Sequence, residues 1–273
     1  MTIRIISGLI GVVIAIFILC FASTPLLPAA IAVLSVIAVC ELYKANDCLQ
    51  YKAMTVTALV YTAAAPFMIY VGNSTYSTLL TTVAVMMLFA SYMGVHKKMN
   101  FEKLAYSVLV PLLISFSMTS LIKLNALSDR HGVVYIVLSL CGAWIADTAA
   151  YFTGTFLGKH KLCPEISPKK TIEGFAGGLI FNGLFMAAFN FVYVTYFAKG
   201  CGVNYISSFF LGVFCAALGT LGDLTASLLK RQRGIKDYGN IMPGHGGVMD
   251  RFDSVLFVAP FMHAYLSMIN IYV

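Results

Sequence analysis

Long apolar runs separated by short polar joints extend along the whole chain. A helix needs about 20 apolar residues to cross the hydrocarbon core of a bilayer, so each run is expected to be a membrane-spanning helix. The joints carry Pro, Gly, Asn or charged residues. Nine such segments can be marked: 5–22, 27–42, 53–71, 77–94, 105–124, 133–157, 174–197, 204–229 and 254–272. The pattern predicts an all-α fold, a polytopic integral membrane helical bundle of about nine transmembrane helices.

The composition supports this fold class and excludes others. Hydrophobic residues make up 60% of the 273 positions and charged residues 11%, against roughly a quarter in a soluble domain. An ordinary cytosolic globule and a disordered chain are both excluded, and no sizeable soluble domain fits between the apolar runs. The seven cysteines show no CxxC and no paired spacing, so neither a disulfide framework nor a cysteine metal site is expected. One polytopic domain over 1–273 is the simplest division.

The basic residues predict how the chain is oriented. The first segment is expected to be retained as a span, since apolar spans continue after it. With a cytoplasmic N-terminus and nine crossings, 15 of the 18 Lys and Arg residues fall on the cytoplasmic side and 3 on the other. This bias agrees with the positive-inside rule and places the polar loops 158–173 and 230–253 on the cytoplasmic side. The net charge of +7 therefore favours anionic headgroups or phosphorylated substrates over nucleic acid.

Two carboxylates lie where a membrane span should be apolar. Asp147 and Asp223 each sit within a predicted segment, and a charge there is costly unless it is paired, wet or bound to a cation. Both are therefore functional candidates. The alternative is a helix-end carboxylate that reaches the interface or pairs with a basic residue. Asp223 shares a stripe of small residues with Gly212, Ala216 and Gly219, a face typical of helix packing in membranes. A similar stripe holds Asp147, Tyr151, Gly154 and Gly158. We expect these two acidic stripes to face one another across a polar cleft.

The stretch 227–253 is the most polar part of the chain. It holds five Lys or Arg residues, three Asp, one His and five Gly. Glycines around His245 let the backbone approach a ligand, and successive N–H groups there favour an anion-binding nest. Asp250 and Asp253 offer hard oxygen ligands for Mg²⁺. The combination indicates nucleotide or pyrophosphate chemistry. A loop that only contacts anionic lipid would explain the basic residues but not the glycines, the histidine or the carboxylates.

The same stretch resembles the signature of the phosphatidate cytidylyltransferases (CDP-diacylglycerol synthases). Met242 departs at one variable position, where that family usually has Leu, Ile or Phe. The segments 144–154 and 167–174 resemble further polar motifs of the family, and the likeness is only general over the first hundred residues. The fixed positions of the signature present here are Ser227, Lys230, Arg231, Lys236, Asp237, Gly239, Pro243, His245, Gly246, Gly247, Asp250, Arg251 and Asp253.

The resemblance implies a reaction in which phosphatidic acid takes CMP from CTP, giving CDP-diacylglycerol and pyrophosphate for phospholipid biosynthesis. It implies Mg²⁺, and it allows a second, monovalent cation. The implied metal ligands are Asp223 and Asp250, with Asp147 and Asp253 as further candidates. The implied catalytic residues are Lys230, Arg231, Lys236, His245 and Arg251. The implied substrate-binding residues are Ser167, Lys169, Lys170, Ser227, Asp237, Gly246 and Gly247.

The resemblance also bears on organisation and location. It implies N-terminal helices over 1–130, a catalytic part over 131–273, a homodimer, and a site open to the cytoplasm and to membrane lipids. Apart from the resemblance, the short chain makes a bacterial cytoplasmic (inner) membrane the expected location, with an organellar membrane as the alternative.

Three other functions are weighed against this one. A CTP-dependent lipid kinase, acting on polyprenol or phytol, would release CDP, and the full signature argues against it. A cation-coupled transporter would explain Asp147 and Asp223 but would leave 230–253 unexplained. The Asp-Gly-x-x-Ala-Arg motif of the CDP-alcohol phosphatidyltransferases is absent from the sequence.

Overall fold

The computed structural model describes residues 2–241 and 246–272, and the chain divides into two compact units. Unit 1 comprises Met1–Lys123 and Gln232–Phe252. Unit 2 comprises Leu124–Arg231 and Asp253–Val273. The chain thus passes from one unit to the other three times, twice inside the signature stretch. Each unit is described here by itself.

Unit 1 is built from consecutive helices that pack on their neighbours in sequence, α1 on α2, α2 on α3 and α3 on α4. Gly72 ends α3 in the left-handed conformation with φ of 78°, and the Asn73 side chain then caps α4 by accepting N–H groups of Thr75 and Tyr76. The elements are α1 (Thr2–Cys20), α2 (Leu26–Ala45), the 3₁₀ turn η1 (Cys48–Gln50), α3 (Lys52–Val71), α4 (Ser74–Val95), α5 (Phe101–Ala126, which ends in unit 2) and α9 (Met249–Phe252).

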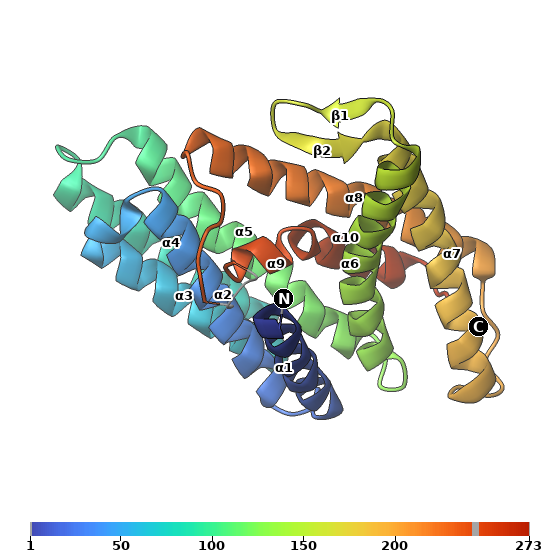
Figure 1. The fold of residues 1–273 in the computed structure, drawn as a ribbon. Coiled ribbons are helices and arrows are strands. Elements are labelled where there is room, and N and C mark those ends of the chain that lie inside the picture. The colour runs from blue at the N-terminus through green and yellow to red at the C-terminus, as the bar shows by residue number, and fades with distance from the viewer. Residues whose placement is uncertain (1, 242–245, 273) are drawn as a thin grey trace. The chain divides into compact units, whose positions relative to one another are not determined.

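Unit 2 is centred on the close pairing of α6 with α7 (Figure 1). Small residues make this approach possible: a Cβ at Gly174 would lie 2.6 Å from the Ala150 carbonyl oxygen, and one at Gly178 would lie 3.1 Å from the Ala146 oxygen. The GxxxG spacing of these glycines thus corresponds to a helix contact. The elements are α6 (Gly132–Leu157), β1 (Lys161–Cys163), β2 (Ser167–Thr171), α7 (Ile172–Tyr196), α8 (Tyr205–Gln232, whose last residue belongs to unit 1) and α10 (Val255–Met268).

The small-residue stripe of α8 packs against several helices of unit 2. A Cβ at Gly212 would lie 2.5 Å from the Asn182 carbonyl oxygen on α7, and one at Gly219 would lie 3.6 Å from the Val258 side chain on α10. Helices without bulky side chains approach closely, which increases their dispersion contacts. The stripe therefore holds the helix that carries Asp223 in place.

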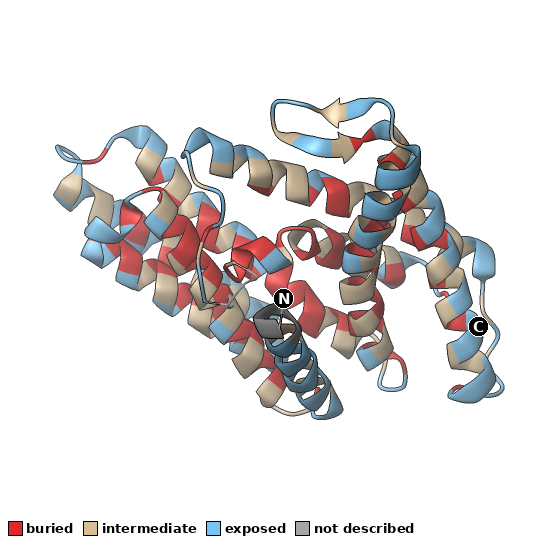
Figure 2. Cartoon of the chain, viewed as in Figure 1, coloured by how far each residue is buried: buried red, intermediate tan, exposed pale blue. Residues whose placement is uncertain are grey.

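The described residues contain seven helices that are long and apolar enough to cross a membrane: α2, α3, α4, α5, α6, α7 and α8. Shorter apolar helices lie at Ile6–Cys20 and Val255–Met268. Many apolar side chains face outward, among them Leu9 at 64% and Val71 at 64% exposed, and α1 is largely exposed in Figure 2. An all-α, polytopic membrane protein is therefore confirmed. The count of nine spans and the cytoplasmic N-terminus stay predictions.

The polar segment 158–173, expected as a loop, forms an antiparallel hairpin (Figure 1). Lys161 pairs with Thr171 and Cys163 pairs with Ser167. The hairpin is short because Thr171 ends β2 and also begins α7, where its side-chain oxygen accepts the N–H of Gly174 at 3.1 Å. This arrangement joins β2 directly to α7 and fixes the strand that carries Lys169 and Lys170.

Candidate active site

Two helix carboxylates of unit 2 reach the same ammonium group. The Nζ atom of Lys170, on β2, lies 2.6 Å from Oδ2 of Asp223 on α8 and 3.9 Å from Oδ1 of Asp147 on α6. All three side chains are only partly exposed, at 21% for Lys170, 39% for Asp147 and 26% for Asp223. The expectation that the acidic stripes of α6 and α8 face one another agrees with this geometry. The alternative hypothesis, that these carboxylates pair with a basic residue, also agrees with the structure because Lys170 is their partner.

A third carboxylate, Asp253, lies just before α10, where the charges of Asp223 and Asp147 reach it. It is 8% exposed, and its Oδ1 accepts the N–H of Ser254 at 2.7 Å. The Ser254 hydroxyl donates to Asp147 Oδ2 at 3.2 Å, which links the two acidic side chains. Burial, followed by the charge of Asp223, raises the pKa of Asp253 from 3.8 to about 7, whereas the Ser254 N–H and Lys230 act in the opposite direction. Asp253 therefore keeps its proton to a higher pH than an exposed aspartate does.

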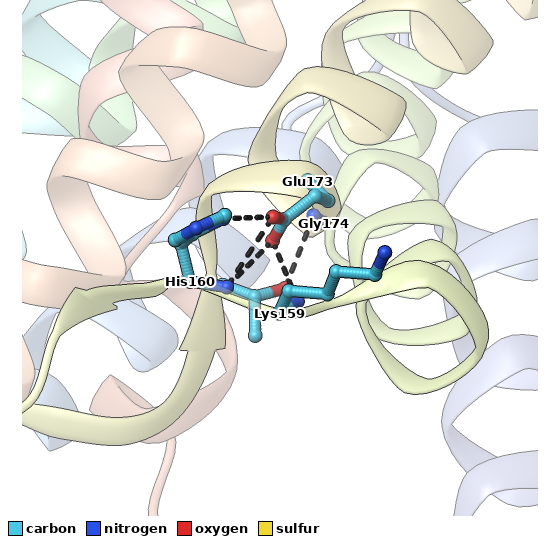
Figure 3. A network of polar contacts seen from close by, with 5 residues as sticks. Lys159, His160, Glu173 and Gly174 are labelled. Atoms are coloured by element: carbon cyan, nitrogen blue, oxygen red, sulfur yellow. Dashed lines mark hydrogen bonds and ion pairs between the residues drawn. The ribbon is translucent and has the colours of Figure 1, made fainter.

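The hairpin that delivers Lys170 is anchored at its base by Glu173 (Figure 3). The Glu173 carboxylate accepts the backbone N–H groups of Lys159 and His160, at 3.0 and 3.2 Å from Oε2. Its Oε1 lies 2.6 Å from Nδ1 of His160. A single side chain in the first turn of α7 thus holds the chain entering β1 beside the chain leaving β2. This contact fixes the hairpin relative to the two helices that it joins.

The other predicted residues of unit 2 lie around this group with less contact. Lys230, on the last turns of α8, is close enough to Asp253 to lower the pKa of that carboxyl group. The Arg231 Nε donates to the Ile166 carbonyl oxygen at 3.5 Å, so its side chain extends toward the hairpin. Ser167 begins β2, Lys169 is exposed beside Lys170, and Ser227 lies partly buried one turn after Asp223.

The part of the signature in unit 1 is held by carboxylates of the protein itself. Asp250 Oδ2 accepts the N–H groups of Tyr238 at 2.8 Å and Gly247 at 3.0 Å. Gly246 adopts φ of 86°, and a Cβ there would lie 3.0 Å from the same carboxylate oxygen and 3.5 Å from Oδ1 of Asp237. A side chain at 246 would therefore be strained and crowded. Lys236 and Arg251 are exposed, and His245 lies outside the described residues.

Glu41 is a site residue that the sequence analysis missed. It lies on α2, is 5% exposed, and its two oxygens accept the N–H groups of Val248 at 3.0 Å and Met249 at 2.8 Å. The N–H groups of Gly247, Val248 and Met249 are therefore directed at carboxylates of the protein, although an anion-binding nest was expected in this stretch. The sequence offered one signal for Glu41, a carboxylate near the end of an apolar segment. Nothing in the sequence indicates that its hydrogen-bond partners lie about 200 residues later.

Carboxylate oxygens are ligands that a hard divalent cation prefers. Asp223 and Asp147 already stabilise one positive charge, the ammonium group of Lys170. Among residues 2–241 and 246–272, no three acidic, His or Cys side chains converge as one ready-made ion cage. Mg²⁺ usually takes one or two carboxylates and completes its shell with water and substrate phosphates, so the donor set still fits it.

These features define a polytopic helical membrane protein in which carboxylates of two apolar helices contact a lysine of a polar hairpin. The chain matches the model of the Cytidylyltransferase family over residues 2–269 and belongs to that family.

Curated relatives agree with this assignment. The chain is 38% identical over 187 residues to a protein of Bacillus subtilis named phosphatidate cytidylyltransferase, covering 68% of this chain and 67% of that protein. It is 42% identical over 140 residues to a protein of the same name from Aquifex aeolicus, and 44% identical over 139 residues to one from Staphylococcus saprophyticus. These two matches cover 51% of this chain, and 48% and 51% of the relatives.

Proposed function

We propose that this protein transfers CMP from CTP to phosphatidic acid, giving CDP-diacylglycerol and pyrophosphate for phospholipid biosynthesis. One observation carries the proposal for this member of the Cytidylyltransferase family: in a membrane protein, Lys170 lies beside Asp223 and Asp147, and the charges of these two carboxylates reach Asp253. Such a combination suits phosphates that are carried by a lipid on one side and by a nucleotide on the other.

The reaction forms one bond and breaks one. An oxygen of the phosphatidate phosphate attacks the α-phosphorus of CTP, and the bond from that phosphorus to the oxygen bridging to the β-phosphate breaks. The electron pair leaves with pyrophosphate. A phosphate monoester has its second pKa near 6 and is already largely dianionic at pH 7, so a strong general base is unnecessary. The main difficulty is that two polyanions must approach one another.

Cationic side chains reduce this repulsion. Lys170 and Lys230 lie beside the carboxylates of unit 2, and Arg231 extends toward the hairpin. These three residues bind and orient phosphate oxygens, while Lys169, Ser167 and Ser227 contact the lipid or nucleotide nearby. For unit 1, the proposal assigns nucleotide binding to Lys236 and Arg251, with Asp237, Gly246, Gly247 and His245. Arginine grips phosphate through two parallel hydrogen bonds and lysine acts as a point charge.

Asp223 and Asp250, with Asp147 and Asp253 as further ligands, would hold Mg²⁺ and an additional monovalent cation. A bound Mg²⁺ supplies charge neutralisation on the phosphates and on the leaving pyrophosphate. Lys170 would neutralise part of the charge of Asp223 and Asp147 and would offer its ammonium group to a substrate phosphate.

The proposal also covers the membrane location, the orientation and the oligomeric state of the enzyme. The distribution of Lys and Arg supports a site on the cytoplasmic side of a bacterial inner membrane, and the family resemblance supports a homodimer. Labelling the two polar loops from outside the cell checks the orientation, and light scattering of the detergent-solubilised protein checks the dimer. Nucleic acid is not an expected partner.

The test follows the α-phosphate of CTP. Purified protein in detergent receives mixed phosphatidate and CTP labelled on that phosphate, with or without Mg²⁺. Mg²⁺-dependent transfer of label into the chloroform phase, matched by pyrophosphate release, is expected. Label that stays aqueous as CDP when a lipid alcohol is supplied would establish the kinase instead. Folded protein that leaves CTP intact in both assays overturns the proposal and returns attention to transport.

A further inference from the structure

A carboxylate early in the chain binds the backbone of the signature. Glu41 is buried near the C-terminal end of α2, and its Oε1 and Oε2 accept the N–H groups of Val248 and Met249 at 3.0 and 2.8 Å. Met249 is the first residue of α9, so Glu41 supplies acceptors where that short helix begins. Hydrogen bonds to an ionised acceptor are roughly twice as strong as neutral ones, and burial shields these from water.

Two glycines of the signature lie directly against this carboxylate. A Cβ at Gly239 would meet Glu41 Oε1, and a Cβ at Gly247 would meet the same oxygen and lie 2.5 Å from Oε2. Neither glycine has a positive φ. Their lack of a side chain is thus explained by the space that the Glu41 carboxylate occupies, without any need for a ligand to approach the backbone at those positions.

Asp250 supports the same segment from within. Its Oδ2 accepts N–H groups of Tyr238 and Gly247. Together with the two Glu41 bonds, four backbone N–H groups of the segment are bonded to two carboxylates. These hydrogen bonds fix the backbone at Tyr238 and at Gly247–Met249. The exposed side chains of Lys236 and Arg251 lie just outside these tied positions, on backbone whose course is fixed by the carboxylates.

We infer that Glu41 is a positioning residue that holds residues 246–252, and with them the neighbouring Tyr238 and Gly239, in the conformation needed to bind the nucleotide. The inference rests on the function proposed above and adds to it a residue from the N-terminal helices. Glu41 touches backbone only in the described contacts, so it acts through the segment and not on the reacting atoms. Replacing it should weaken CTP binding and leave phosphatidate binding nearly unchanged.

The first experiment compares Glu41→Gln with Glu102→Gln. The control removes a carboxylate of the same unit whose ion pair with Arg233 is 3.6 Å long and whose side chain is 78% exposed, so it should have little effect. In Glu41→Gln, the amide NH₂ faces a backbone N–H that needs an acceptor. The KM for CTP should rise at least about 10-fold, as expected for losing a charge-assisted bond. The KM for phosphatidate should stay within about 2-fold by the same reasoning.

A second readout does not depend on activity. Hydrogen exchange followed by mass spectrometry should show faster exchange in peptides covering 246–252 of Glu41→Gln, with α6 and α7 unchanged. If wild-type protein transfers no CMP, the proposed function fails, yet this measurement still decides whether Glu41 holds the segment. Unchanged exchange at 246–252 together with an unchanged KM for CTP would overturn the inference. A uniform rise in exchange over all helices would also overturn it, because that result indicates a general loss of stability.

A double-mutant cycle tests the contact itself. Gly239→Ala places a methyl group against the Glu41 carboxylate and should speed exchange at 246–252. In a Glu41→Ala background the space is free, so adding Gly239→Ala should change exchange by less than it does in wild type. Additive effects would contradict the direct contact.

Discussion

Lys170 lies between Asp223 and Asp147, with its Nζ 2.6 Å from the first and 3.9 Å from the second. The strand, α8 and α6 each contribute one of these side chains. Lys169, the neighbour in sequence, is exposed instead. Two adjacent lysines that the sequence presents as equivalent are therefore in different environments, and only Lys170 offsets the charge of the helix carboxylates.

Replacing Lys170 should impair turnover far more than replacing another hairpin lysine. In Lys170→Met the carboxylates lose their positive partner and the substrate loses a phosphate contact, so kcat should fall about 10- to 100-fold. The matched control is Lys161→Met, because Lys161 is exposed at the start of β1. Initial rates of CTP conversion at saturating substrates make the comparison. Equal rates in both variants would remove Lys170 from the site.

Two substitutions at Asp250 separate its charge from its support of the backbone. Asparagine keeps an oxygen that accepts from Tyr238 and Gly247, whereas alanine removes it. We expect both variants to lose turnover by about 100-fold or more if the charge holds Mg²⁺, but only Asp250→Ala to speed hydrogen exchange at 237–247. Asp223→Asn should lose turnover similarly with the protein still inserted and extractable. Near-normal activity in Asp250→Asn would refute the metal assignment.

Glu173 should control the rigidity of the hairpin. Without its carboxylate, the N–H groups of Lys159 and His160 lose their acceptor and the chain entering β1 is released. Trypsin should then cleave after Lys159 and Lys161 in Glu173→Ala about 10-fold faster than in wild type, as expected when a region opens more readily. Glu165→Gln, an exposed change in the same hairpin, is the control. Identical cleavage rates in the two variants would show that Glu173 does not anchor the hairpin.

The metal-free protein should lose stability as the pH rises from about 4 to 7, because in this range Asp253 holds a proton in the folded protein but not in the unfolded chain. The pKa of Asp253 is about 7 in the folded protein and 3.8, the ordinary value of an exposed aspartate, in the unfolded chain. Between about pH 4 and 7 the unfolded chain therefore releases a proton that the folded chain retains. Unfolding is therefore favoured progressively on going from pH 4 to pH 7, by a free energy on the order of a few kcal/mol.

Thermal unfolding in detergent with a chelator measures this effect. Asp253→Asn carries no titrating group and should flatten the decline of Tm with pH. The same slope in Asp253→Asn and wild type would assign the pH dependence to other groups.

The helices could be predicted because long apolar segments make up most of the chain. The segment expected at 133–157 is α6 at Gly132–Leu157, and that expected at 53–71 is α3 at Lys52–Val71. The last segment, expected to reach residue 272, ends as a helix at Met268. There the chain leaves the helix, and Tyr272 forms a β-bridge with Val203. Such a tertiary pairing overrides apolar composition and has no local signal.

The site could be predicted only in part. Asp147 and Asp223 could be identified because a carboxylate in an apolar membrane helix is energetically costly and usually has a function. Glu41 was overlooked, since it lies one turn before Lys44 and resembles an interfacial residue in sequence. The hairpin was also missed, because Ser167–Thr171 contains Pro168 and two lysines and lacks the alternation typical of a strand. In both cases the determining interaction joins residues distant in the chain.

The division of the signature between the units has a consequence for biosynthesis. Unit 1 includes Gln232–Phe252 as well as the first helices, and Glu41 obtains its partners only from that late segment. During translation the early helices must wait in the membrane, with a buried acidic group unsatisfied, until the ribosome has made Met249. A chain interrupted before that point cannot complete its first unit. The quality-control proteases of the cell would therefore meet a product truncated before Met249 as an incompletely folded protein.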